Sequence, residues 1–367
     1  MYLGSSIQQE IDPNFIGPPE ISQSRTLRFH LTGFAPTLRL DVEPMQAYLT
    51  EILRSLLSPI RIVFLPSVKI YWLYLFSSVL ITLLFVAWRS RKTKGASFRD
   101  SLREILSKRV WLHKSALIDY KYYFINTFFF ALSFGYFVLS GASVSFFVSM
   151  HLSEAFGMRE NIFPPGAFFI FLYSILFWLA NDFGRFFAHW LLHKTFLWEF
   201  HKLHHSAKVL NPLTVYRVHP VEAILVNSLG ALCSGIVTGV ALFLFPNGIN
   251  MISFLGVNAG IFVFNLYANL RHSHIGLRFP NWLSRILLSP AQHQIHHSTN
   301  IILQNKNIGV SFAIWDVLFG SLYIPQEDEA ENTIFGLEEE KDEDFQNLFS
   351  IYFLPFRRIL ERIKNRS

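Results

Sequence analysis

Long apolar stretches recur along this chain and are separated by shorter polar connections. The stretches lie at 70–88, 122–150, 167–180, 221–245 and 251–268. The first contains no charged residue in its 19 positions, and most of the others approach or exceed the roughly 20 apolar residues that cross a bilayer as a helix. The pattern predicts an all-α, polytopic membrane protein with four to five transmembrane helices.

Basic residues gather directly after the first apolar stretch. Between positions 89 and 121 there are ten Lys and Arg against three Asp and Glu, which places this loop in the cytoplasm by the positive-inside rule. Five crossings counted from the loop leave the N-terminus outside and place 181–220 and 271–367 in the cytoplasm. The short segment 246–250 predicts a tight helical hairpin, although fewer crossings with one re-entrant hairpin remain an alternative.

The chain divides into four segments by composition. Residues 1–66 are polar and interrupted by prolines, with one amphipathic piece at 44–58 that we expect at the membrane interface. Residues 67–165 carry the first spans and the basic loop, and 166–325 carry most of the histidines. Residues 326–367 form the tail.

The tail itself has two parts of different character. Ten acidic residues and one lysine occupy 327–344, a charge run that we expect to be solvated. Residues 348–364 mix apolar and basic side chains, which predicts an interfacial helix.

Composition supports the membrane assignment and argues against a nucleic-acid partner. The chain is 51% hydrophobic and only 16% charged, with a mean hydropathy of +0.32. A net charge of +6 could indicate nucleic-acid binding. The basic residues, however, crowd beside apolar spans, where cytoplasmic retention explains them better.

The most informative polar residues are the histidines, because 11 of the 14 lie between His189 and His297. They form three clusters, H-W-L-L-H, H-K-L-H-H and H-Q-I-H-H, which begin at His189, His201 and His293. Positions i, i+3 and i+4 share a helix face, so each cluster presents its imidazoles together. Neutral imidazole is the commonest metal ligand, and the clusters therefore predict a metal site.

The number of imidazoles and the absence of other motifs restrict the chemistry. One catalytic zinc needs three protein ligands, whereas nine or more imidazoles suit two metal ions, and redox-active iron suits such a site better than zinc. Trp190 stands where a zinc protease carries the glutamate of HExxH. There is no G-x-G-x-x-G motif and no P-loop, so an oxidase of this kind would need a separate electron donor.

The order of the three clusters resembles that of the fatty acid hydroxylase/sterol desaturase superfamily of membrane di-iron oxygenases. The flanking sequences F-H-K-L-H-H-S-A, L-N-P-L-T-V-Y-R-V-H-P-V-E and N-K-N-I-G-V-S-F-A-I-W-D are similar to those of bacterial sterol desaturase-type members. The resemblance covers about 180–354 and implies that 166–325 is the catalytic domain. It is specific for the superfamily and says little about the substrate.

The resemblance implies a set of nine metal ligands in a cytoplasmic helical cap. They are His189, His193, His201, His204, His205, His272, His293, His296 and His297. His219 could ligate metal or hydrogen-bond to a ligand, and His274 is an accessory position. The lone His30, His113 and His151 are expected at surfaces or interfaces.

Several other polar residues near the clusters are candidates for supporting roles. Candidates for fixing the imidazole tautomers are Asp182, Glu199, Tyr216, Glu222 and Asp316. For Trp315, packing in the core is at least as consistent with the sequence as a direct role in the site. Arg217 could hold either a carboxylate or an anionic headgroup.

The implied reaction is O₂-dependent hydroxylation or desaturation at a C–H bond of a lipid: a sterol, a fatty acyl chain, or a related isoprenoid or ether lipid. It requires two iron ions, O₂ and a separate electron donor, either a cytochrome b5-like protein or a ferredoxin with its reductase. The alternative is a membrane metal transporter or metal-binding protein. Transport would need ligands near the middle of the bilayer, whereas these ligands are expected at one face of the membrane, which argues against it. The closest sequence resemblance favours a bacterial inner membrane over the endoplasmic reticulum.

Overall fold

The fold is described from a computed structural model, which is almost entirely helical. It describes residues 42–92, 97–158, 160, 164–326, 329–330, 332–338, 340 and 342–365. The chain forms two units, Met1–Met45 and Gln46–Ser367, and the features discussed below belong to the second. His30 lies outside the described residues.

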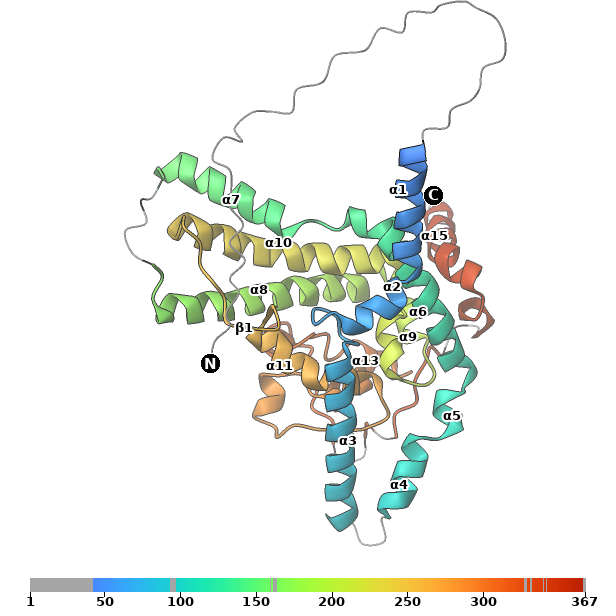
Figure 1. Cartoon of the computed structure of the whole chain (residues 1–367). Helices are drawn as coiled ribbons and strands as arrows, with labels where there is room; N and C mark the ends of the chain where they lie inside the picture. The colour runs from blue at the N-terminus through green and yellow to red at the C-terminus, as the bar shows by residue number, and fades with distance from the viewer. Residues whose placement is uncertain are drawn as a thin grey trace, which may run out of the picture. The chain divides into compact units, whose positions relative to one another are not determined.

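Helices account for most of the described chain, and Figure 1 shows their arrangement. In chain order they are α1 (Val42–Leu56), α2 (Ser58–Arg61), α3 (Trp72–Lys92), α4 (Phe98–Ile105), α5 (Lys108–Trp111), α6 (Lys114–Leu132), α7 (Gly141–Phe156), α8 (Ala167–Lys194), α9 (Trp198–His205), α10 (Pro220–Leu244), α11 (Ala259–Ala268), α12 (Pro290–His296), α13 (Ile301–Gln304), α14 (Ile314–Leu318) and α15 (Leu348–Lys364). The strands β1 (Ser253–Phe254) and β2 (Val257–Asn258) pair antiparallel.

Four helical segments among the described residues are long and apolar enough to cross a membrane. They are Trp72–Lys92, Phe134–Phe156, Ala167–Lys194 and Pro220–Leu244. The predicted class, an all-α integral membrane protein with four to five spans, is therefore confirmed. The amphipathic pieces predicted at 44–58 and 348–364 are helical too, as α1 and α15.

Two of the predicted spans differ from the helices observed. The stretch 122–150 is broken between α6 and α7, so its spanning part begins at Phe134. The stretch 251–268 is not one helix: it begins with the β1–β2 hairpin, and Asn258 caps α11 by accepting hydrogen bonds from the backbone of Gly260 and Ile261. A cap at this position starts the helix only at residue 259, which leaves it too short to span a bilayer.

Helices α7, α10 and α8 lie side by side, with α10 in the middle (Figure 1). Their close approach depends on glycine. A Cβ atom at Gly239 of α10 would lie 2.6 Å from the Cβ of Val148 on α7, and one at Gly235 would lie 2.8 Å from that of Val144. Small residues of this kind let membrane helices pack backbone to backbone.

Helix α3 lies to one side of these three helices, in a different direction, and packs on α11 (Figure 1). The Ser77 hydroxyl donates a hydrogen bond to the Leu266 carbonyl at 2.6 Å, which fixes this contact. Large side chains on the opposite face, among them Trp72, Phe76 and Leu84, are exposed.

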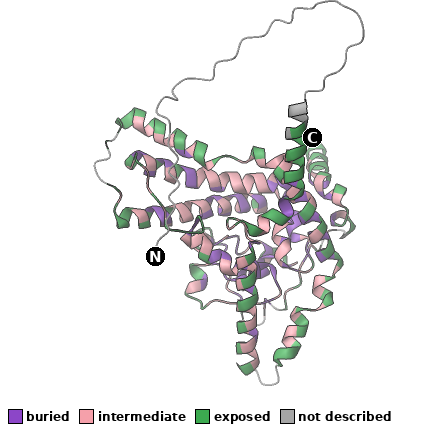
Figure 2. Cartoon of the chain, viewed as in Figure 1, coloured by how far each residue is buried: buried purple, intermediate pink, exposed green. Residues whose placement is uncertain are grey.

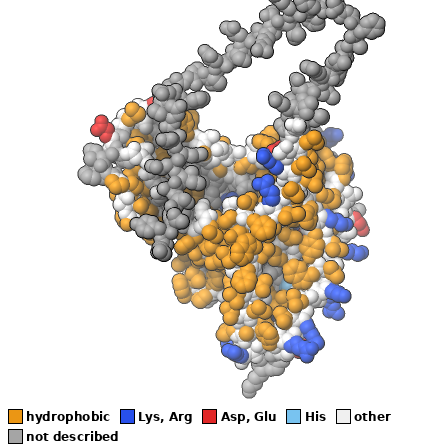
Figure 3. Space-filling view, in the orientation of Figure 1, with side chains coloured by type: hydrophobic (Ala, Val, Ile, Leu, Met, Phe, Trp, Pro, Cys, Tyr) orange, Lys and Arg blue, Asp and Glu red, His pale blue; other side chains and the backbone are white. Residues whose placement is uncertain are grey.

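The exposed surface of the spans is apolar, as expected of helices that face lipid. Figure 2 shows exposed and half-buried positions along α3, α7, α8 and α10, and Figure 3 shows hydrophobic side chains spread over α3 and α11. Basic residues gather at the end of α3, where Arg89, Arg91 and Lys92 form its last turn. This charge distribution is typical of a helix that ends at a membrane–water boundary.

The α7–α10 contact predicts a sensitive position. We expect Gly239→Ala to lower the free energy of unfolding by about 1–3 kcal/mol, because the new methyl group overlaps Val148. Gly141→Ala at the start of α7 is the matched control, since a Cβ atom there would make only ordinary contact, with the Ala231 carbonyl oxygen at 3.5 Å. The measurement is thermal unfolding in mild detergent, and equal midpoints for the two variants would contradict the packing described.

Candidate metal centre

Four separate elements bring the clustered histidines together. The last turns of α8 carry His189 and His193, and α9 follows directly after it. A short 3₁₀ helix, η4 (Asn269–His272), ends with His272. Helix α12 begins at a capping box between Ser289 and Gln292, with proline at its first position, which is a strong local start signal.

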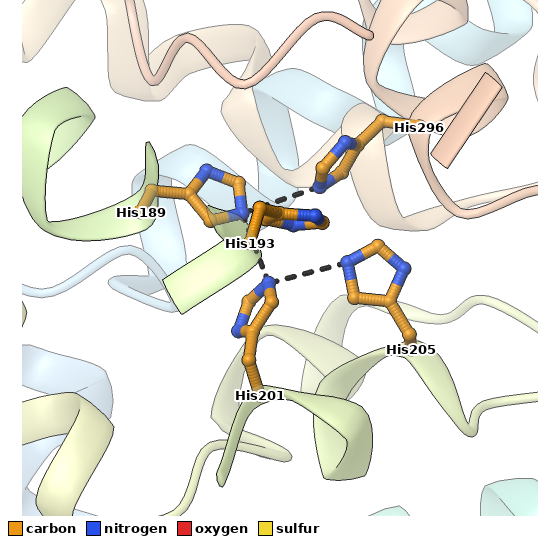
Figure 4. A group of neighbouring side chains, drawn as sticks. All are labelled: His189, His193, His201, His205 and His296. Carbon is orange, nitrogen blue, oxygen red and sulfur yellow. Dashed lines mark hydrogen bonds between the residues drawn. The ribbon is translucent and has the colours of Figure 1, made fainter. Parts of the chain in front are cut away.

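The nine histidines form two groups, and the ligand atoms within each group lie within 4.8 Å of one another. The five-histidine group contains His189, His193, His201, His205 and His296. The four-histidine group contains His204, His272, His293 and His297. Figure 4 shows the five rings of the first group converging from α8, α9 and α12 on one small volume.

Each H-x-x-H-H cluster is divided between the two groups. In α9, His201 and His205 belong to the five-histidine group, whereas His204 belongs to the other. The second H-x-x-H-H divides the opposite way, because its middle histidine, His296, joins the five-histidine group. Consecutive positions such as i+3 and i+4 point about 100° apart around a helix, so one helical turn contributes to both groups.

Adjacent Nε2 atoms have the spacing of ligands around a metal ion. The His189–His201 pair is 2.9 Å apart, and both the His189–His296 and His204–His272 pairs are 3.2 Å apart. A metal–nitrogen distance of about 2.0–2.1 Å puts neighbouring ligand atoms about 2.9–3.4 Å apart in octahedral or tetrahedral geometry. The geometry of both groups therefore fits a bound ion.

Hydrogen bonds on the other ring nitrogen, Nδ1, determine whether those Nε2 atoms carry a proton or a free lone pair. The Nδ1 atoms of His189 and His296 donate to the carbonyls of Ile308 and Lys306, at 2.7 Å and 2.9 Å. A neutral imidazole has one proton, so the two Nε2 atoms face each other with lone pairs. That arrangement needs a cation between them.

A carboxylate orients a third member of the five-histidine group. The Nδ1 of His201 donates to Oε1 of Glu222, on α10, at 2.7 Å. This position was among those expected to fix a tautomer. In the four-histidine group all four Nδ1 atoms lack a partner among the described residues, as does the Nδ1 of His205 in the five-histidine group.

Two buried carboxylates hold the loop that supplies the carbonyl acceptors. Asp316 accepts hydrogen bonds from the backbone of Ile308 and Gly309 and from the Ser321 hydroxyl. Burial raises the pKa of Asp316 to about 6, which still leaves it ionised at neutral pH. The Ile308 carbonyl, which accepts the hydrogen bond from His189, is therefore held in place by Asp316, a residue outside the histidine groups.

Asp182 holds the continuation of the same loop. It accepts from the backbone of Ser311 and Phe312 and from Nε1 of Trp315. Trp315 therefore has a structural role, as one of the two readings of the sequence suggested.

The buried imidazoles are neutral and thus able to ligate. Burial, followed by the charges of His189 and Lys69, lowers the pKa of His204 to about 3. Burial also lowers the pKa values of His205 and His297 well below the ordinary value, with further contributions from neighbouring imidazoles. A lone pair is available on each ring at neutral pH.

His219 lies outside both groups and does not fit the ligand role considered for it. It caps α10: its Nδ1 accepts from the backbone of Val221, and its Nε2 donates to the Tyr352 carbonyl on α15.

His274 is also outside both groups. Burial lowers its pKa, and the nearby charge of Glu104 acts in the opposite direction. Of the lone histidines, His113 caps α6 and His151 is exposed.

Glu199 binds the tail rather than a histidine. It forms ion pairs with Lys202, with Arg358 at 3.7 Å and with Arg362 at 2.6 Å. Glu340, from the acidic run, pairs with Lys202 and Arg358 at 2.6 Å. This part of the run is therefore held against α9 and α15, contrary to the expectation of a merely solvated segment.

Arg217 and Tyr216 are structural in their contacts. Arg217 is buried, donates to Oδ1 of Asp119 at 3.0 Å and also binds the Leu203 carbonyl of α9. Tyr216 packs edge to face on Tyr123. Of the two partners considered for Arg217, a carboxylate is the one observed.

Comparison with known proteins agrees with this geometry. Residues 174–321 match the fatty acid hydroxylase family, a segment that contains all nine histidines of the two groups. The class defined by fold and site, a helical membrane protein with two histidine groups able to hold metal, is the class that the sequence motifs indicated. The resemblance to the fatty acid hydroxylase family is thus confirmed over these residues.

Two characterised relatives are similar to part of the chain. Ornithine lipid hydroxylase OlsE of Rhizobium tropici is 29% identical over 189 residues, which are 50% of this chain and 52% of the relative. Human alkylglycerol monooxygenase is 29% identical over 182 residues, which are 47% of this chain and 36% of the relative. The match thus spans about half of the first relative and less of the second. No solved structure gives a significant match.

The contacts of His219 predict a pH dependence. Burial lowers its pKa from the ordinary value to about 4, so the folded chain favours the neutral ring. The stabilisation is present above about pH 6.5 and is lost as pH falls towards about 4, a change of about 3 kcal/mol. We therefore expect the free energy of unfolding, measured with denaturant in detergent, to fall less at acidic pH in His219→Gln than in the unaltered chain. The difference between the two proteins should equal this contribution of His219. Parallel pH curves for the two proteins would contradict the assignment.

Proposed function

We propose that the protein is an O₂-dependent di-iron oxygenase that hydroxylates or desaturates a lipid. The nine converging imidazoles, with lone pairs facing one another at ligand spacing, carry this proposal. The names of both relatives, a lipid hydroxylase and an alkylglycerol monooxygenase, support a lipid substrate. Two iron ions, one in each histidine group, would supply the redox capacity to activate O₂.

The chain's own residues give the site rigidity and exclude water. Eight of the nine histidines are buried, and His193 is partly buried. Ile308, Lys306 and Glu222 fix the orientation of three rings. Partners of this kind hold a ligand in its metal-binding tautomer and position.

The membrane location determines how substrate and electrons arrive. A lipid would reach the histidine groups from the bilayer, alongside the apolar spans. Electrons would come from a separate cytochrome b5-like protein, or from a ferredoxin with its reductase, on the cytoplasmic side. We assign the protein to a bacterial inner membrane on its sequence resemblance.

The direct test is metal content together with product analysis. Protein purified in mild detergent should contain about two irons per chain and show the Mössbauer signature of a coupled pair after exposure to O₂. Cells that express it should accumulate an oxidised lipid carrying ¹⁸O from ¹⁸O₂, or a new alkene. One zinc per folded chain, or no stoichiometric metal, would refute the proposal and favour hydrolysis or transport.

The nine histidines should be individually necessary. We expect alanine in place of His205 or His297 to reduce turnover at least about a hundredfold while the protein still inserts, because each substitution removes one ligand from a group. His151→Ala, at an exposed position, is the control and should keep full activity. Full activity in the His205 and His297 variants would remove these residues from the site.

We expect Glu222 to affect metal binding only through its hydrogen bond to His201. Glu222→Ala removes the acceptor at 2.7 Å from His201, and we expect metal affinity in the five-histidine group to fall about 10–100-fold. Glu222→Gln retains a hydrogen-bond acceptor, so the metal affinity should fall less in this variant. Chelator competition measures both, with Asp100→Ala on the exposed face of α4 as control. Equal loss in the Gln and Ala variants would show that the bond to His201 is unimportant.

A further inference from the structure

Beside the histidine groups lies a set of positive charges that the proposed reaction does not use. Lys69 precedes α3, Arg185 lies on α8, and Arg271 precedes His272. The charges of Arg271 and Arg185 both act on Lys69, as does that of Asp182, the one carboxylate found among them. An ionisable group buried in a membrane protein is costly unless it has a partner or a function.

Lys69 has no side-chain partner among the residues that the structure describes. Its backbone is fixed, because the side-chain amide of Asn269 donates to the Lys69 carbonyl at 2.8 Å. Burial, followed by the charges of Arg271 and Arg185, lowers the pKa of Lys69 well below its ordinary value. The backbone of Lys69 is thus held next to the segment that carries Arg271, and its half-buried side chain has no hydrogen-bond or ion-pair partner among the described residues.

Arg271 is buried, with only 2% of its surface exposed, and its hydrogen bonding is incomplete. One terminal nitrogen donates to the Val310 carbonyl at 2.6 Å, and the guanidinium lies over the ring of Phe264. Its Nε and the nearby Tyr267 hydroxyl are buried without a partner among the described residues. Both are groups that can donate a hydrogen bond to an acceptor.

Asp182 offsets part of the positive charge of this set, but one carboxylate faces three cations and forms no ion pair with any of them among the described residues. Its oxygens already accept from the backbone of Ser311 and Phe312 and from the Trp315 indole. Arg185 binds the neutral side chains of Asn181 and Asn227. None of the three cations forms an ion pair within the described part of the chain, so donors and positive charge exceed acceptors and negative charge.

We propose that Lys69, Arg271 and Tyr267 form a binding site for the anionic group, a carboxylate or a phosphate, of the lipid on which the protein acts. Charge-assisted hydrogen bonds from an ammonium and a guanidinium are the usual means of holding such groups. This inference rests on the proposed function, and it restricts the substrate to an acidic amphiphile.

The position of the site relative to the histidines has a consequence for the reaction. The charge of Lys69 acts on His204 and His272, and Arg271 is next to His272 in the chain. A lipid held by its anionic group here would present carbons close to that group, rather than the end of its chain, to the histidine groups.

The test compares an acid and an alcohol of the same chain length. The full-length protein, in phosphatidylcholine nanodiscs without an electron donor, is photolabelled with a diazirine-bearing hexadecanoic acid. Unlabelled hexadecanoic acid, hexadecan-1-ol and inorganic phosphate then compete for labelling. We expect the acid to compete at about tenfold lower concentration than the alcohol, with label on peptides that contain Lys69 or Arg271.

Variants separate charge from fold. Lys69→Met should reduce the acid-over-alcohol preference to near parity, whereas Lys69→Arg and the exposed control Lys108→Met should keep it. Equal competition by acid and alcohol in the unaltered protein, or a preference that survives Lys69→Met, would overturn the proposal. Competition by phosphate as strong as that by the acid would overturn the lipid source, because the site would then take a free anion.

The unaltered protein provides the decisive comparison even if Lys69→Met does not fold. Binding needs neither iron nor turnover, so this result is independent of the metal and product analyses. A clear acid preference in a protein without iron would leave the anion site intact and reject the oxygenase.

Discussion

The structure around the site depends on one electrostatic constraint: neutral imidazole lone pairs are brought together where water is excluded. Lone pairs that face one another at about 3 Å repel unless a cation lies between them. Ile308 and Lys306 make the constraint strict, because their carbonyls keep the protons of His189 and His296 on Nδ1. The surrounding fold must therefore hold the rings in place against repulsion whenever metal is absent.

Several distant segments cooperate to meet that demand. Asp182 and Asp316 tie the loop that follows α13 to α8 and α14, and Glu222 reaches His201 from the start of α10. The close packing of α10 on α7 and α8 gives Glu222 a rigid base. The tail contributes as well, since the Glu199 ion pairs join α9 to α15.

Much of this architecture could be predicted from local sequence. Hydropathy indicated the four spans, and histidine spacing indicated the nine residues that the structure gathers into two groups. Hydropathy failed at 251–268 because averaging over an apolar stretch hides the capping effect of a single Asn258. The segment boundaries, the electron donor and the metal identity stay predictions.

Contacts between residues far apart in the chain could not be predicted in the same way. Spacing alone suggested that each H-x-x-H-H cluster acts as a unit, whereas helix rotation divides it between two groups. Glu199 was a reasonable candidate for a histidine partner by proximity in sequence, but the basic face of α15 lies closer in space. Lys69 carried no local signal, because it lies about 120 residues before the first cluster.

The division of each H-x-x-H-H cluster has a consequence for how the site is assembled. Because a single turn of α9 and a single turn of α12 contribute to both groups, ordering either helix around a first ion lowers the entropy still to be lost when a second ion binds. If each group binds one ion, the two loading events would be coupled, and by linkage the coupling would have the same strength in either order. Such a protein would pass between empty and fully loaded states with little of the singly loaded form, so an isolated redox metal would rarely be exposed to O₂.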